Sequence, residues 1–90
     1  MVKEMKSLIK KLDAENIPYD LVENSLFGCP QVFVPSAREK NYVIDFISHE
    51  YTYGGSEGLL EAYGPKLGDA IGWLNSEKAF ELAKKVYKGK

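Results

Sequence analysis

The residues of this chain that could do chemistry are few. They are its only cysteine, its only histidine and the acids close to that histidine. Asp45 and His49 are four positions apart, and Glu50 follows the histidine directly. On a helix this spacing would place an acid and an imidazole on one face, where they could hold a metal ion. On a strand four residues span roughly 13 Å, which is too far for one ion with ligands at ~2 Å.

The composition of this stretch favours a strand. Residues 42–53 are dense in β-branched and aromatic side chains, which pack well on a pleated surface. We therefore predict one long central strand, followed by a glycine-rich turn at residues 54–58. Asp45 could still meet Glu61 across the resulting hairpin. In the alternative, Asp45 bonds a neighbouring backbone group or a tyrosine hydroxyl, and His49 lies near the surface.

Cys29 and the glycine-rich residues 54–58 can each be interpreted as a chemical site or as a structural feature. Cys29 could act as a nucleophile only with a base such as His49 within hydrogen-bond reach, and we favour a half-buried structural cysteine instead. Residues 54–58 could suggest a phosphate-binding loop, but no lysine follows and Glu57 would repel a phosphate. We predict a turn there. The chain is thus expected to be non-enzymatic, with no catalytic or metal-binding residue and no cofactor.

Length and composition indicate one soluble domain. Ninety residues, 44% of them hydrophobic and 28% charged, are typical of a single globular domain that spans residues 1–90. No apolar run approaches the ~20 residues that cross a bilayer, and the first residues lack the apolar region of a signal peptide. A single cysteine cannot form an internal disulfide, which agrees with a reducing compartment. We expect a cytoplasmic protein.

The hydrophobic periodicity predicts an α+β fold. A helix over residues 2–15 should stop at Asn16, and Asn75 should cap a final helix that continues to about Lys88. The segments between them alternate as strands do; they are residues 19–23, 31–34, 42–53, 59–63 and, as a short strand or an irregular approach to the helix, 70–74. We predict a single antiparallel, meander-like sheet of four to five strands, with both terminal helices packed on one face.

The charges are distributed unevenly. Residues 1–12 carry a net charge of +3, residues 13–63 carry −7 and residues 64–90 carry +3. If both helices cover the same face of the sheet, their lysines form a basic layer that could contact an anion or nucleic acid. The candidate contacts are Lys6, Lys10, Lys84, Lys85 and Lys88. The alternative is a solvated surface whose last lysines complement the helix dipole.

Tyrosines offer a second candidate surface at the end of the central strand. Tyr51 and Tyr53 should lie on one side of the chain, with His49 beside them and Tyr63 nearby. Tyrosine is enriched in binding surfaces because it brings a large area at low entropic cost. We predict a surface for an unknown protein partner or for a second copy of the chain in a homodimer. The alternative is a lid over a small core.

Two resemblances bear on function. The order of helix, strands and helix, with Ser76-Glu77-Lys78-Ala79 opening the last helix, resembles a double-stranded-RNA-binding domain. Other segments resemble small proteins of phages and prophages of Gram-positive bacteria, a group without an established activity; they are Ile17-Pro18-Tyr19, Phe33-Val34-Pro35-Ser36, His49-Glu50-Tyr51-Thr52-Tyr53-Gly54-Gly55, Gly58-Leu59-Leu60-Glu61 and residues 72–80. The second resemblance implies a small accessory protein. We therefore expect a protein-interaction module, with nucleic-acid binding as the alternative.

Overall fold

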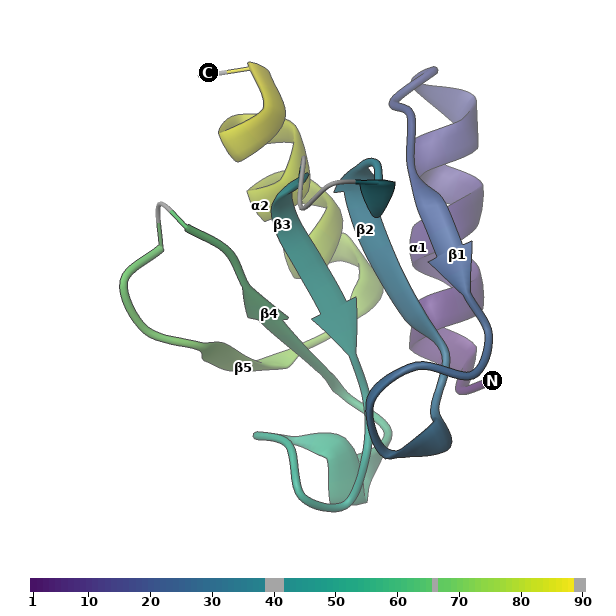
Figure 1. The fold of residues 1–90 in the computed structure, drawn as a ribbon, viewed down its shortest axis with the longest axis vertical. Coiled ribbons are helices and arrows are strands. Elements are labelled where there is room, and N and C mark those ends of the chain that lie inside the picture. The colour runs from purple at the N-terminus through teal and green to yellow at the C-terminus, as the bar shows by residue number, and fades with distance from the viewer. Residues whose placement is uncertain (39–41, 66, 89–90) are drawn as a thin grey trace.

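An antiparallel sheet with two helices on one face makes up the fold (Figure 1). The structure is a computed structural model that describes residues 1–38, 42–65 and 67–88. Among these residues five strands form the sheet in the order β1-β2-β3-β4-β5, so each strand pairs with the next one in the chain. The helices and strands are α1 (Lys3–Ala14), β1 (Asp20–Val22), β2 (Gln31–Pro35), β3 (Tyr42–Ile47), β4 (Leu60–Tyr63), β5 (Ile71–Leu74) and α2 (Ser76–Lys88). The predicted α+β meander is confirmed.

Helix α1 ends where the sequence predicts. Asn16 adopts a left-handed backbone with φ of 56°, a conformation that asparagine tolerates better than most residues. This bend lets the backbone N–H of Ile17 donate to the carbonyl of Leu12 at 2.9 Å, the bond that closes a Schellman cap. The chain then turns directly into β1, and the buried Ile17 side chain joins the core.

The start of helix α2 is fixed by two acceptors. The side-chain oxygen of Asn75 accepts a hydrogen bond from the N–H of Lys78 at 2.8 Å, which confirms the predicted N-cap. Glu4 of α1 reaches across and accepts from the N–H of Ser76 at 2.6 Å. A carboxylate at this position also complements the positive end of the α2 dipole. One side chain of α1 therefore ties the beginnings of the two helices together.

Replacing Glu4 with alanine should lower the free energy of unfolding by about 1–2 kcal/mol, because a charge-assisted bond to a helix N-terminus is lost. Urea denaturation of Glu4→Ala at neutral pH measures this change. Glu81→Ala is a matched control, since Glu81 is an exposed acid within α2. Equal effects of the two substitutions would mean that the Glu4 contact adds no stability.

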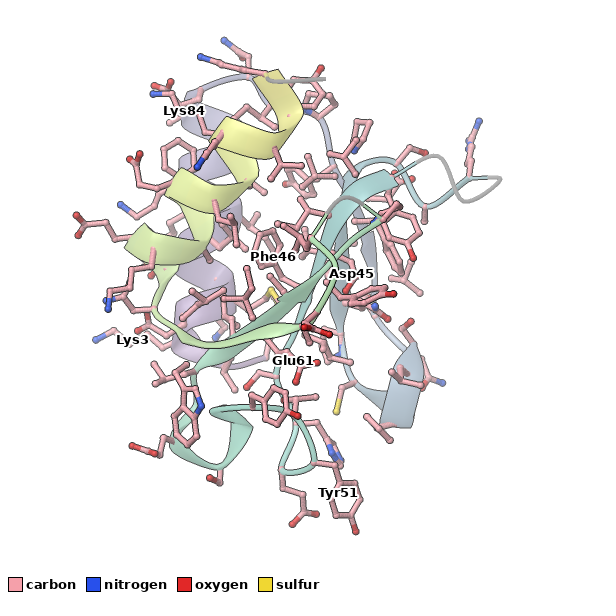
Figure 2. All side chains as sticks on the ribbon, turned by 90° about the vertical axis from the view of Figure 1, so that its left-hand side faces the viewer. Lys3, Asp45, Phe46, Tyr51, Glu61 and Lys84 are labelled. Carbon is pink, nitrogen blue, oxygen red and sulfur yellow. The ribbon has the colours of Figure 1, made fainter. Side chains whose placement is uncertain are left out.

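The alternation of side chains along the strands divides the sheet into a core face and an open face. Phe46 of β3 lies opposite Val32 and Ala62, and all three are buried beneath the helices. The helices contribute Met5, Leu8, Leu12, Ala79 and Ala83 to this core. The preceding residue of the strand, Asp45, points the other way because successive side chains alternate. Figure 2 shows Phe46 between the sheet and the helices.

The central strand is shorter than predicted. β3 ends at Ile47, so the expectation of a strand that continues to residue 53 is wrong in its second half. Thr52 causes the change, because its hydroxyl accepts from the N–H of His49 at 2.9 Å and donates to the carbonyl of the same residue at 2.7 Å. Such local bonds compete with strand pairing. His49 therefore lies in a turn beyond the strand that carries Asp45.

Candidate interaction surface

Two loops meet at one end of the molecule. In a meander, alternate connections fall at the same end of the sheet, so residues 23–30, between β1 and β2, lie beside residues 48–59, between β3 and β4 (Figure 1). The first loop contains the 3₁₀ turn Leu26–Gly28 and the second contains the 3₁₀ turn Gly55–Glu57. The predicted glycine-rich turn is confirmed, since Gly54 and Gly58 flank the second 3₁₀ turn with left-handed backbones.

Three rings from the two loops are in contact. The Phe27 ring stacks on the His49 imidazole with centroids 4.6 Å apart and planes 20° apart. Tyr51 meets Phe27 edge-on at 5.8 Å and lies 4.9 Å from His49. The imidazole is oriented by its Nδ1 atom, which accepts from the N–H of Tyr51 at 3.1 Å. The Tyr51 side chain is nevertheless 76% exposed, so the cluster presents a ring to solvent.

Tyr53 is anchored through its backbone while its ring stays free. Its N–H donates to Oε2 of Glu61 at 2.7 Å, and its carbonyl accepts from the N–H of Trp73 at 3.1 Å. Gly72 allows this approach, because a β-carbon there would lie 2.0 Å from the β-carbon of Tyr53. The Tyr53 side chain is 60% exposed. The loop therefore holds the tyrosine in a defined position without burying it.

Two exposed aromatic residues have a strained backbone. Among the described residues, the non-glycine residues with a left-handed backbone are Asn16, Phe27 and Trp73, with φ values of 56°, 59° and 60°. For a bulky residue this conformation costs roughly 1–2 kcal/mol. Phe27 is 50% exposed and Trp73 is 55% exposed, so neither ring is fully buried in compensation. Strain of this kind concentrates at functional sites.

The predicted surface residues separate into two groups. His49 and Tyr51 are in contact at the loop end of the molecule, and Tyr53 belongs to the same loop. Tyr63 lies elsewhere, because it pairs with Asp45 in the sheet register and so belongs to the open face. Phe27 and Trp73 were not among the residues predicted for this surface. The signals that could have found them are an apolar pair, Leu26-Phe27, inside a polar loop and a tryptophan beside a glycine.

The open face of the sheet carries a buried acid. Asp45 is 5% exposed, and the pKa of its carboxyl is raised to about 6, first because burial removes it from water and also because the Glu61 charge lies near. A hydrogen bond from Gln31 opposes the rise, and Gln31 itself accepts from the Ser25 hydroxyl at 2.7 Å. Figure 2 shows Asp45 and Glu61 close together, on the sheet side of the molecule. Glu61 is thus close enough for its charge to act on Asp45, which the sequence allowed as one of two possibilities.

Cys29 makes a weak contact in the first loop. Its thiol donates to the carbonyl of Phe27 at 3.7 Å, and the residue is half-buried, as predicted. It lines a cavity of about 380 Å³ together with Met1, Val2, Met5, Pro30 and Ser48. In the part of the chain that the structure describes, no three His, Cys, Asp or Glu side chains group closely enough to hold a metal ion.

The lysines of the two helices share one side of the molecule. Figure 2 shows Lys3 and Lys84 on the helical side, opposite the open face of the sheet. Lys84 lies 3.7 Å from a carboxylate oxygen of Glu15 and 5.8 Å from the centre of the Phe80 ring. The other candidate lysines also belong to these helices; they are Lys6, Lys10, Lys85 and Lys88. Their contact with an anion stays a prediction.

No helix within the described residues is long and apolar enough to cross a membrane. Comparisons of the chain with models of known protein families, with curated proteins and with solved structures found no match.

Proposed function

We propose that this chain is a protein-interaction module that binds its partner through the aromatic end, which we define as Phe27, His49, Tyr51, Tyr53 and Trp73. The observation that carries the proposal is the left-handed backbone of Phe27 and Trp73, whose side chains stay about half exposed. A chain that served only to fold would have a glycine or an asparagine at such positions. An aromatic ring at such a position is explained if the ring contacts the binding partner.

The composition of the aromatic end supports this use. Tyrosine, tryptophan and other aromatics supply most of the binding energy in protein interfaces, and they do so best when they are already held in place. Tyr53 is held by two backbone hydrogen bonds, and the Phe27, His49 and Tyr51 rings hold one another. Binding through the Phe27, His49 and Tyr51 rings would therefore cost little conformational entropy.

Replacing the strained aromatics with glycine should separate stability from binding. Phe27→Gly relieves the strain of the left-handed backbone, which stabilises the fold. It also removes the ring contacts and raises the conformational entropy of the unfolded chain, which destabilise the fold. These effects offset each other, so the free energy of unfolding should change by less than about 1 kcal/mol. Loss of an interface anchor should weaken binding by about 2 kcal/mol or more. Photo-crosslinked capture from host-cell lysate measures binding, and urea denaturation measures stability. We expect the same pattern for Trp73→Gly.

Tyr63→Ala provides the matched control, since it removes an exposed tyrosine from the open face of the sheet. This variant should capture the same partner as the wild type. Light scattering of the pure protein tests whether the partner is a second copy. Capture that survives both glycine substitutions, or a loss of stability of several kcal/mol on Phe27→Gly, would contradict the proposal.

The proposed setting is that of a small, non-enzymatic accessory protein in the cytoplasm. The resemblance to phage and prophage proteins supports this setting, as does the single cysteine.

A further inference from the structure

The two loops that carry most of the aromatic end contain charges of one sign. Residues 23–30 and 48–59 hold every residue of the aromatic end except Trp73, and they contain Glu23, Glu50 and Glu57 but no lysine or arginine. All three glutamates are exposed. Figure 2 shows Tyr51 away from Lys3 and Lys84, which lie on the helical side. The loops that carry these rings therefore expose carboxylates, whereas Lys3 and Lys84 lie on the helical side.

The rings and the carboxylates favour the same kind of ligand group. The face of an aromatic ring carries partial negative charge and attracts an ammonium or guanidinium group. Tyr51 and Tyr53 offer such faces to solvent, since their side chains are 76% and 60% exposed. An acidic partner would be repelled by the three glutamates, whereas a basic one would be attracted both by the glutamates and by the rings.

We infer that the partner segment bound at the aromatic end presents arginine or lysine side chains. The inference rests on the proposed function and adds the chemistry of the partner to it. In this arrangement the cationic head groups lie over the tyrosine rings and beside Glu50 and Glu57. The apolar stems of the same side chains cover the ring edges, as long basic side chains do at interfaces.

Titration with short synthetic peptides tests the inference. The probes alternate glycine with arginine, lysine, glutamate or leucine, and the emission of Trp73, the only tryptophan of the chain, reports occupancy. We expect the arginine and lysine peptides to bind at low ionic strength, the glutamate peptide not to bind, and added salt to weaken binding. Glu50→Lys with Glu57→Lys should weaken binding of the arginine peptide about tenfold.

Glu77→Lys with Glu81→Lys is the matched control, because these exposed glutamates lie on α2. This pair should leave peptide affinity unchanged. A different outcome is that the leucine peptide binds as tightly as the arginine peptide, with Tyr51→Ala abolishing the binding of both. This result would contradict a basic partner but would support the aromatic end as a binding surface. If no peptide binds at low ionic strength, the inference fails. Failure of the proposed function itself would appear separately, as lysate capture that Phe27→Gly and Trp73→Gly leave intact.

A second copy of the chain could also supply lysines, from α1 and α2. Light scattering of the pure protein distinguishes a second copy of the chain from a different partner protein. Self-association that rises with concentration and disappears on Glu50→Lys with Glu57→Lys would overturn the assignment to a different protein. We expect the pure protein to show no such association.

Discussion

Replacing Gly55 with alanine should lower the free energy of unfolding by about 3 kcal/mol, at the upper end of what overpacking costs. A β-carbon at this position would lie 1.6 Å from the carbonyl oxygen of His49 and 2.6 Å from the hydroxyl oxygen of Thr52. The first atom is backbone and cannot rotate away. The second belongs to the hydroxyl that closes the turn, so the substitution should also displace Tyr51 and Tyr53 from their positions.

Gly58→Ala is the matched control for Gly55→Ala. Gly58 has a left-handed backbone with φ of 74°, but nothing lies within 4 Å of a β-carbon placed there. Only backbone strain opposes the change, at a cost of about 1 kcal/mol. Urea denaturation gives both free energies, and Trp73 emission reports the loop, because the N–H of Trp73 donates to the carbonyl of Tyr53. If Gly55→Ala is no more destabilising than Gly58→Ala, the turn is looser than the contacts of Gly55 indicate.

The parts of the fold that could be predicted are those decided by a few neighbouring residues. Asn16 ends α1 and Asn75 caps α2 because each uses its own side chain or backbone within one turn of the helix. The meander follows from the same local rule, since short connections join strands that are adjacent in the chain. These features would be visible in any fold that contained the same segments.

The end of β3 shows why the other features could not be predicted. Residues 48–53 have the composition of a strand, yet a pair of bonds between Thr52 and His49 bends the chain out of the sheet. A threonine favours strands by propensity, and nothing in the residue type indicates that its hydroxyl will find a backbone partner three residues away. Strand composition therefore predicted a longer strand than the one that forms.

The aromatic end depends on contacts between distant segments. Phe27 reaches His49 because the β1–β2 and β3–β4 loops fall at the same end of the sheet. Trp73 bonds Tyr53 because Gly72 lets the loop approach β5. The left-handed backbone of a phenylalanine or a tryptophan runs against local preference, so no reading of neighbouring residues predicts it. The tyrosines were predicted as a surface, while the two strained aromatics beside them required the structure.

Replacing Asp45 with asparagine should stabilise the protein at pH 7 by about 1–2 kcal/mol and have almost no effect at pH 4. The pKa of Asp45 is raised to about 6 from 3.8, by burial first and by the Glu61 charge as well. A carboxyl whose pKa is raised on folding contributes its stability below the unfolded pKa, where it is protonated in both states. That contribution is lost as the pH rises through about 6, because the folded state must then bury a charge.

The expected gain in stability follows from the pKa shift of Asp45, reduced because water still reaches the carboxylate in part. Each pKa unit corresponds to about 1.4 kcal/mol, so the full shift would be worth about 3 kcal/mol, and partial access of water to the carboxylate reduces it. The asparagine carbonyl can still accept the hydrogen bond that the Gln31 side chain donates to Asp45. The substitution therefore removes the charge and keeps the contact.

Asp20→Asn is the control, and its effect should have the opposite sign. The pKa of Asp20 is lowered, mainly by the hydrogen bond from the N–H of Ala37 and also by the bond from the Ser36 hydroxyl. Its carboxylate therefore stabilises the fold above the unfolded pKa, and this stability is lost as the pH falls through the lower folded value. Urea denaturation of both variants at pH 4 and pH 7 should show Asp45→Asn gaining stability and Asp20→Asn losing it, each at the higher pH. An Asp45→Asn variant that is destabilised equally at both pH values would mean that the pKa of Asp45 is not raised on folding, and a larger loss at pH 7 would mean that the fold stabilises the carboxylate.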